Sequence, residues 1–287
     1  MDEDKRGTVA SDAVTMARKG LLDALEALEP HLDALVLVGA QAIYLQTGST
    51  QVALAEYTTD GDVAIDPELL GSDPLIEKAM SDAGFRLDPR SDVVGTWISP
   101  RGVSVDLMVP DAVAGAGRRG VQLPPHSHTA MRRARGLEAA LVDNSKMVIC
   151  SFDIEDDPRT FTVAVASPAA LLVAKLHKIH DRMNNPTRLD DKDAHDVYRL
   201  LYAFDTQVFT ASIDRLLDEE VSAQVTREAL DYLDKLFAHG SDAQGSRMAG
   251  TAEELIGDPT AVAESVSLLA QDLLDDLQPQ HRTYSVT

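Results

Sequence analysis

The sequence has little cysteine, few basic residues and no long apolar run. A single cysteine, Cys150, in 287 residues excludes an intramolecular disulfide and favours a reducing compartment. Lysine and arginine number 26 against 47 aspartate and glutamate residues, so the formal net charge of −21 disfavours general binding to polyanions. No window approaches the roughly 18 apolar residues of a membrane span, and residues 1–6 lack the apolar segment of a signal peptide. We therefore expect a cytoplasmic protein without a membrane partner.

The chain divides into a part with mixed strand and helix patterns and a part with helical patterns. Ser167-Pro168 marks the change, because serine at an N-cap followed by proline begins a helix. We expect a core at 13–166, a helical domain at 167–277, and flexible tails at 1–12 and 278–287. Within the core, short strands are expected near 139–142, 147–152 and 161–165, together with a hairpin formed by 93–99 and the strand 103–109.

The most informative pattern is an Asp-x-Asp pair at the start of an apolar strand. Asp60 and Asp62 are two residues apart and therefore project to the same side, while Val63 and Ile65 follow toward the core. Two adjacent carboxylates repel one another unless a proton, a cation or solvent compensates them. The pair is typical of a site for a hard cation such as Mg2+ or Mn2+.

Two further segments add to this pattern. In the strand 103–109 the apolar residues alternate onto one face and leave Asp106 on the other. The turn Gly39-Ala40 follows the apolar strand 35–38 and precedes an expected helix, an arrangement that brings backbone amides to a phosphate. Taken alone, Asp106 is as well explained by a position on the solvent-exposed face of a half-buried strand, with no role in a site.

Cations border the apolar stripe of the first helix after residue 167. Lys175, Lys178 and Arg182 share one flank of that helix. Asp193 lies on the core-facing side of the next helix and needs a partner there, for which Lys175 or Lys178 is the candidate. The alternatives are a lysine that simply extends to solvent and an aspartate that interacts with its own helix dipole.

Arginines gather in the segment 117–136, which contains no acidic residue. They form a local positive patch on an acidic molecule, or a solvated surface segment. As a patch they predict contact with tRNA, through Arg118, Arg119, Arg132, Arg133 and Arg135.

Taken in order, these segments resemble the DNA polymerase beta-like nucleotidyltransferase superfamily, in particular the branch of AbiEii-type toxins and their uncharacterised relatives. The resemblance covers about residues 35–200. It implies an α+β fold, with a mixed β-sheet flanked by helices (the nucleotidyltransferase fold) followed by a helical C-terminal domain. The matching segments are Val38-Gly39-Ala40, Thr58-Thr59-Asp60-Gly61-Asp62, Val105-Asp106-Leu107, 165–177 and Lys192-Asp193-Ala194-His195-Asp196.

The resemblance also implies a reaction. A substrate hydroxyl would attack the α-phosphorus of a nucleoside triphosphate (NTP) and release pyrophosphate. Two Mg2+ or Mn2+ ions would be held by Asp60, Asp62 and Asp106, with Asp106 also assisting deprotonation of the hydroxyl. The nucleotide would be bound by Gly39, Ala40, Thr59, Lys175, Lys178 and Asp193.

Three functions follow as hypotheses. The first is a nucleotidyltransferase acting on tRNA, as the toxin of a toxin-antitoxin or phage-defence pair with an antitoxin protein as partner. The second transfers the nucleotide to a small molecule or a protein. The third is a catalytically weakened nucleotide-binding regulatory module, because Ala40 stands where the family turn has glycine or serine, and Glu56-Tyr57 replaces a basic residue.

Overall fold

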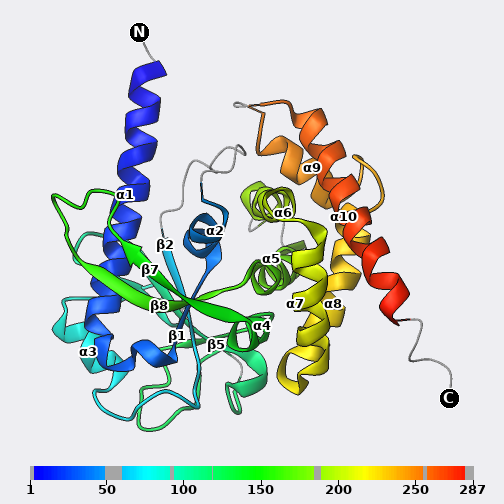
Figure 1. Ribbon diagram of the computed structural model, residues 1–287. Coiled ribbons are helices and arrows are strands. Elements are labelled where there is room, and N and C mark those ends of the chain that lie inside the picture. Colours follow the sequence, from blue (N-terminus) through cyan, green and yellow to red (C-terminus); the bar gives the residue numbers. More distant parts are fainter. Residues whose placement is uncertain are drawn as a thin grey trace.

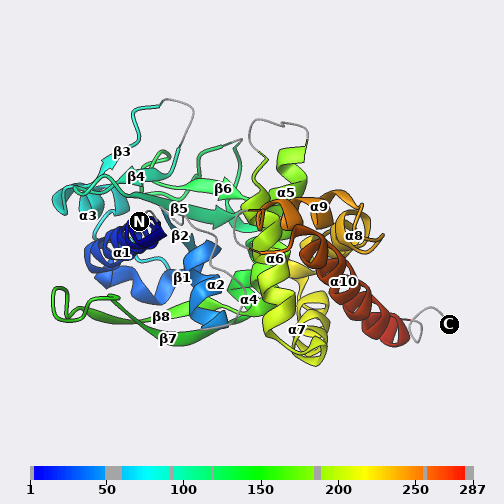
Figure 2. The ribbon, with the colours of Figure 1, turned by 90° about the horizontal axis from the view of Figure 1, so that it is seen from above.

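The computed structural model describes residues 3–48, 60–90, 94–117, 119–183, 189–254 and 257–281, with side chains between residues 13 and 277. A strongly curled mixed sheet forms one half and a group of helices forms the other (Figures 1 and 2). This arrangement confirms the expected α+β class, in which a mixed sheet flanked by helices is followed by a helical C-terminal part. Within the described ranges, no helix is long and apolar enough to cross a membrane.

The sheet has eight strands in the order β3-β4-β5-β2-β1-β8-β7, and β6 also pairs with β5. β2 runs parallel to β5 and antiparallel to β1, while β1 runs parallel to β8. The two most informative sequence segments therefore lie on neighbouring strands at the middle of the sheet. The strands are β1 (Leu35–Val38), β2 (Asp60–Ile65), β3 (Arg86–Leu87), β4 (Thr96–Ile98), β5 (Ser104–Pro110), β6 (Arg132–Ala134), β7 (Asn144–Cys150) and β8 (Thr160–Ala166).

One helix packs inside the curved sheet, and the C-terminal helices pack at one side of it (Figure 2). α1 lies between the β3-β4-β5 part and the β7-β8 hairpin, and α5 to α10 stack beyond α2 and α4 (Figure 2). The helices are α1 (Glu3–Ala27), α2 (Gly39–Thr47), α3 (Ile76–Asp82), α4 (Glu138–Val142), α5 (Pro168–Met183), α6 (Asp191–Ala203), α7 (Thr206–Asp218), α8 (Glu220–Phe237), α9 (Gln244–Thr251) and α10 (Pro259–His281), with short 3-10 helices at Glu29–Ala34 and Asp111–Val113.

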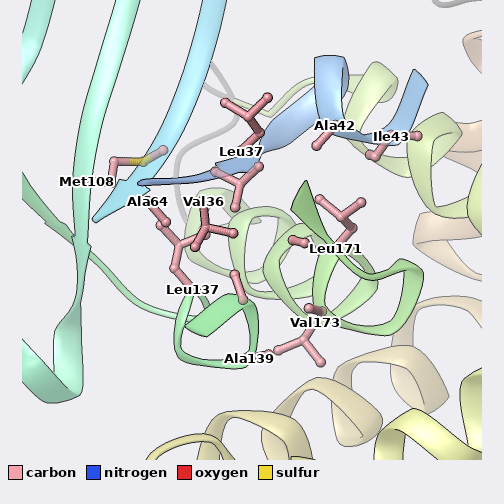
Figure 3. Packing of buried hydrophobic residues seen from close by; sticks show 14 of the residues in the cluster. Val36, Leu37, Ala42, Ile43, Ala64, Met108, Leu137, Ala139, Leu171 and Val173 are labelled. Carbon is pink, nitrogen blue, oxygen red and sulfur yellow. The ribbon is translucent and has the colours of Figure 1, made fainter. Parts of the chain in front are cut away.

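The apolar core runs without a break from the sheet to the helices that follow it. Figure 3 shows side chains of β1 and β2 beside those of α2, α4 and α5. Leu37, Ile43 and Leu171, which come from three of these elements, are at most 1% exposed. Burial of this kind contributes about 25 cal/mol per Å² of apolar surface, so the shared core ties α5 to the strands that carry the carboxylates.

Two expectations about local structure were wrong, and two helix ends differ from those expected. α1 begins at Glu3, so the segment expected as an N-terminal tail is helical from that residue; it contains no proline and begins with acidic residues, which favour a helix start. Residues 139–142 belong to α4 and not to a strand, because Ala139 and Ala140 favour a helix and are fully buried there. The helix α10 continues past 277 to His281. The hairpin partner of β5 is shorter than expected and covers Thr96–Ile98.

Candidate active site

Three carboxylates meet on one face of the sheet. In the register of the parallel pair β2 and β5, Asp62 lies directly opposite Asp106, and Asp60 opposite Ser104. Asp60 precedes Asp62 by two residues and projects from the same face. All three are partly buried. The parallel pairing of β2 with β5 therefore brings together the aspartates that the sequence separates by more than a strand and a helix.

Asp106 is the most constrained of the three. Thr96 lies opposite it on the antiparallel strand β4, and the Thr96 hydroxyl donates to Asp106 Oδ1 at 2.5 Å. Arg132 on β6 donates from Nη2 to Asp106 Oδ2 at 2.7 Å. Each oxygen of Asp106 thus has a hydrogen-bond donor. Thr96 could be found from the sequence only by fixing the hairpin register, because its own segment carries no motif.

Burial and the neighbouring carboxylates disfavour the charged form of Asp62. Burial and the neighbouring Asp60 raise the pKa of Asp62 to about 7, and Asp106 adds to the rise. Lys178 and Arg132 act in the opposite direction on the same pKa. A carboxyl whose proton affinity is raised in this way is a group that a cation can stabilise in its charged form.

Gly39 brings the backbone against this carboxyl. Gly39 has a φ of +68°, and a Cβ built on it would lie 2.0 Å from Asp62 Oδ2 and 2.7 Å from Asp62 Cβ. Only glycine adopts this conformation easily and leaves this space. α2 begins at Gly39, so the positive end of its dipole lies beside Asp62. Ala40, the second residue of the helix, is partly buried.

A network of buried hydrogen bonds holds the backbone of Asp60. Gln41 on α2 donates from Nε2 to the Asp60 carbonyl at 3.2 Å, and accepts from Arg18 Nε at 2.7 Å. Arg18 on α1 is 4% exposed, donates to the Cys150 carbonyl at 3.0 Å, and lies 4.4 Å from the centre of the Phe152 ring. Burial lowers the pKa of Arg18 to about 10. Sequence analysis missed Arg18 and Gln41, whose only signal is a polar residue on the inner side of an otherwise apolar helix.

The predicted partnership between the lysines of α5 and Asp193 is confirmed. Lys175 lies 2.8 Å from Asp193 and 2.6 Å from Asp196, and Lys178 lies 3.0 Å from Asp193. Arg182 adds a third cation to Asp193 at 2.8 Å. Burial opposes the charge of Lys175, but the two aspartates hold its pKa well above the ordinary value. Burial alone would raise the pKa of Asp193, yet the surrounding cations hold it well below its usual range.

The two lysines differ in their access to the cluster of carboxylates. Lys175 is 5% exposed and lies between two aspartates. The side chain of Lys178 is 38% exposed, and its charge lowers the pKa of Asp62. Lys178 therefore presents a more exposed charge than Lys175, which joins α5 to α6.

The arginines expected to form a basic patch are largely paired with acids. Arg132 binds Asp106, Arg133 donates to Asp111 at 2.8 Å, and Arg135 donates to Glu228 at 2.7 Å. Carboxylates of β5, the segment after it and α8 therefore lie next to three of the five arginines expected to contact tRNA. Arg119 is described and Arg118 lies outside the described residues, as does Thr59.

The residues present fit a divalent cation at Asp60 and Asp62. Carboxylate oxygens are the preferred ligands of Mg2+, and the raised pKa of Asp62 indicates charge for a cation to offset. Among the described residues, no group of three or more His, Cys, Asp or Glu side chains is arranged to hold a metal ion.

Comparison with known proteins adds little to this description. No protein-family model matches the chain, and no curated protein matches it. A solved structure from H. pylori, described as a "putative nucleotidyltransferase", is similar at 10% sequence identity and a TM-score of 0.30, over 94% of this chain and 97% of that chain. A likeness at that TM-score bears on neither the fold nor the activity of this chain, so both rest on its own residues.

Proposed function

We propose that this protein is a metal-dependent nucleotidyltransferase that moves a nucleoside monophosphate from an NTP to a hydroxyl acceptor. The observation that carries the proposal is the pairing of Asp62 with Asp106 on adjacent parallel strands, with Asp60 on the same face. The close approach of Gly39 to Asp62 supports it, since a helix N-terminus beside a metal site suits a triphosphate.

The roles of the residues follow from their positions. Asp60 and Asp62 would hold Mg2+ or Mn2+, which supplies positive charge to the α-phosphate and to the leaving pyrophosphate. Asp106, beside Asp62, would accept a hydrogen bond from the attacking hydroxyl and so orient it. The first amides of α2, at Gly39 and Ala40, would bind phosphate oxygens. Lys178 would meet the same phosphates from α5, held in place by its ion pair with Asp193.

The acceptor is the second part of the proposal. The net charge of −21 and the pairing of Arg132, Arg133 and Arg135 with acids favour a cationic small molecule or a protein side chain over tRNA. The toxin hypothesis, with tRNA as acceptor and an antitoxin as partner, is one alternative. A regulatory module that binds a nucleotide without turnover is the remaining alternative, and the engagement of Asp106 by Arg132 is the observation that favours it.

The test compares the three acceptor classes in one experiment. The protein is incubated with the four α-labelled triphosphates and Mg2+, together with bulk tRNA, a set of aminoglycosides or the protein alone. We expect label on the aminoglycosides or the protein, and its loss in Asp60→Ala. Asp66→Ala is the matched control, because Asp66 follows the same strand outside the cluster. Absence of transfer to every acceptor, with Asp60→Ala indistinguishable from the parent, contradicts the proposal.

A further inference from the structure

Arg132 lies among the carboxylates as a fixed cation. It lies opposite Met108 in the parallel pairing of β6 with β5, and Met108 follows Asp106 by two residues on the same face. The guanidinium therefore lies diagonally across from Asp106, and its Nη2 is 2.7 Å from Asp106 Oδ2. Both side chains are mostly shielded, with 33% of Arg132 and 20% of Asp106 exposed.

The charge of Arg132 lowers the number of metal ions needed to balance the three carboxylates. When all three are ionised, the carboxylates carry three negative charges, and the ion pair with Arg132 offsets one of them. The charges on Asp60 and Asp62 remain, which match one divalent cation. A second divalent cation bound at Asp106 Oδ2 would share that oxygen with a guanidinium, and like charges in such proximity repel. Asp106 Oδ1 is occupied as well, by the hydroxyl of Thr96 at 2.5 Å.

We propose that Arg132 takes the place of a second metal ion, so that the site binds one divalent cation at Asp60 and Asp62. Asp106 is then held by Arg132 and Thr96 as a hydrogen-bonding group and is not a metal ligand. This inference rests on the proposed function, because it concerns the cation that the transfer reaction uses. It differs from the two-ion arrangement that the resemblance implies, and Arg132 is the residue responsible for the difference.

Arg133 provides a matched control on the same strand. The two arginines are neighbours on β6 and project to opposite faces, and each is paired with one aspartate. Arg133 Nε is 2.8 Å from Asp111 Oδ1, outside the cluster, and its Nη1 also binds the Gly115 and Gly117 carbonyls. Replacing either arginine by glutamine removes one positive charge and one ion pair from the same strand.

The experiment counts bound Mn2+ by electron paramagnetic resonance. The full chain is titrated with Mn2+ in the presence of an equal concentration of the α,β-methylene analogue of ATP, and thermal melting verifies that each variant is folded. We expect one Mn2+ per chain for the parent and for Arg133→Gln, and two for Arg132→Gln. Arg132→Lys, which restores the charge, should return the count to one.

Two outcomes overturn the inference. Two Mn2+ ions bound to the parent would show that Arg132 does not exclude a second metal ion. That result would not contradict the proposed nucleotidyl transfer. One Mn2+ in both the parent and Arg132→Gln would show that Arg132 does not set the number. Absence of bound Mn2+ in every variant would instead refute the proposed function itself, and the inference with it.

Discussion

Substitution of Gly39 by alanine tests whether the backbone at this position fixes Asp62. The added Cβ meets two obstacles. A φ of +68° costs an L-residue about 1–2 kcal/mol. The Cβ would also lie 2.0 Å from Asp62 Oδ2 and 2.7 Å from Asp62 Cβ. Rotation of the Asp62 carboxylate relieves the contact with Oδ2 but not the contact with Cβ, so the start of α2 or the strand β2 must shift.

The control for this substitution is Gly240→Ala. Gly240 has a φ of +87°, and a Cβ built there meets no atom within 4 Å. It therefore carries the conformational cost alone, about 1–2 kcal/mol of unfolding free energy. Gly39→Ala should lose about 1–3 kcal/mol more, as expected for an overpacked site. Urea denaturation followed by circular dichroism measures both values.

The functional consequence should be larger than the structural one. A displacement of about 1 Å in a catalytic group can reduce a rate about 100-fold. We expect Gly39→Ala to lose at least that factor in nucleotidyl transfer and to bind Mn2+ more weakly, while Gly240→Ala retains the parent values. If Gly39→Ala folds and transfers nucleotide within about threefold of Gly240→Ala, the reasoning that Gly39 positions Asp62 is refuted.

Three further predictions concern Asp62, the two lysines of α5 and Gln41. Because the pKa of Asp62 is raised to about 7, protonated Asp62 stabilises the metal-free fold fully below the ordinary pKa of 3.8, and this stabilisation is lost as the pH rises through 7. Asp62→Asn should therefore flatten the slope of unfolding free energy against pH, measured by urea denaturation between pH 4 and 8. Equal slopes in the parent and the variant would contradict this prediction. Lys175→Met leaves two buried aspartates less compensated and should cost about 3–5 kcal/mol of unfolding free energy. Lys178→Met should change that free energy by about 1 kcal/mol or less and raise KM for the NTP. Equal stability losses would refute a structural role for Lys175 that Lys178 does not share. Gln41→Leu removes the support of Asp60 and should weaken Mn2+ binding about 10–100-fold, while Gln46→Leu on the same helix should not; similar affinities in both would argue against the role of Gln41.

The aspartates could be predicted because each lies in a strand with a clear pattern. Alternation fixes which face Asp62 and Asp106 occupy, and two strands of one sheet offer few ways to bring them together. The partnership of Lys175 with Asp193 could be predicted for a similar reason, since a charged residue on a buried helix face requires a compensating group. These inferences depend on local periodicity, which the sequence displays directly.

The contacts of Arg132 and Arg18 could not be predicted in the same way. Arg132 reaches Asp106 only because β6 pairs with β5 after a long loop, and Arg18 reaches Gln41 only because α1 crosses the curl of the sheet. Neither pairing leaves a periodic signal in the chain. The sequence for that reason left open whether the arginine segment forms a positive patch, although acids from β5 and α8 lie beside it.

The central claim is that Asp60 and Asp62 support transfer of a nucleoside monophosphate, and the most direct test follows the position of the label. Parallel reactions with α-labelled and γ-labelled NTP are run with Mg2+ and the acceptor mixture. We expect α-label on the acceptor and γ-label in released pyrophosphate, with both signals lost in Asp60→Asn. Transfer of the γ-label to the acceptor, or α-label transfer that survives in Asp60→Asn, would contradict the claim.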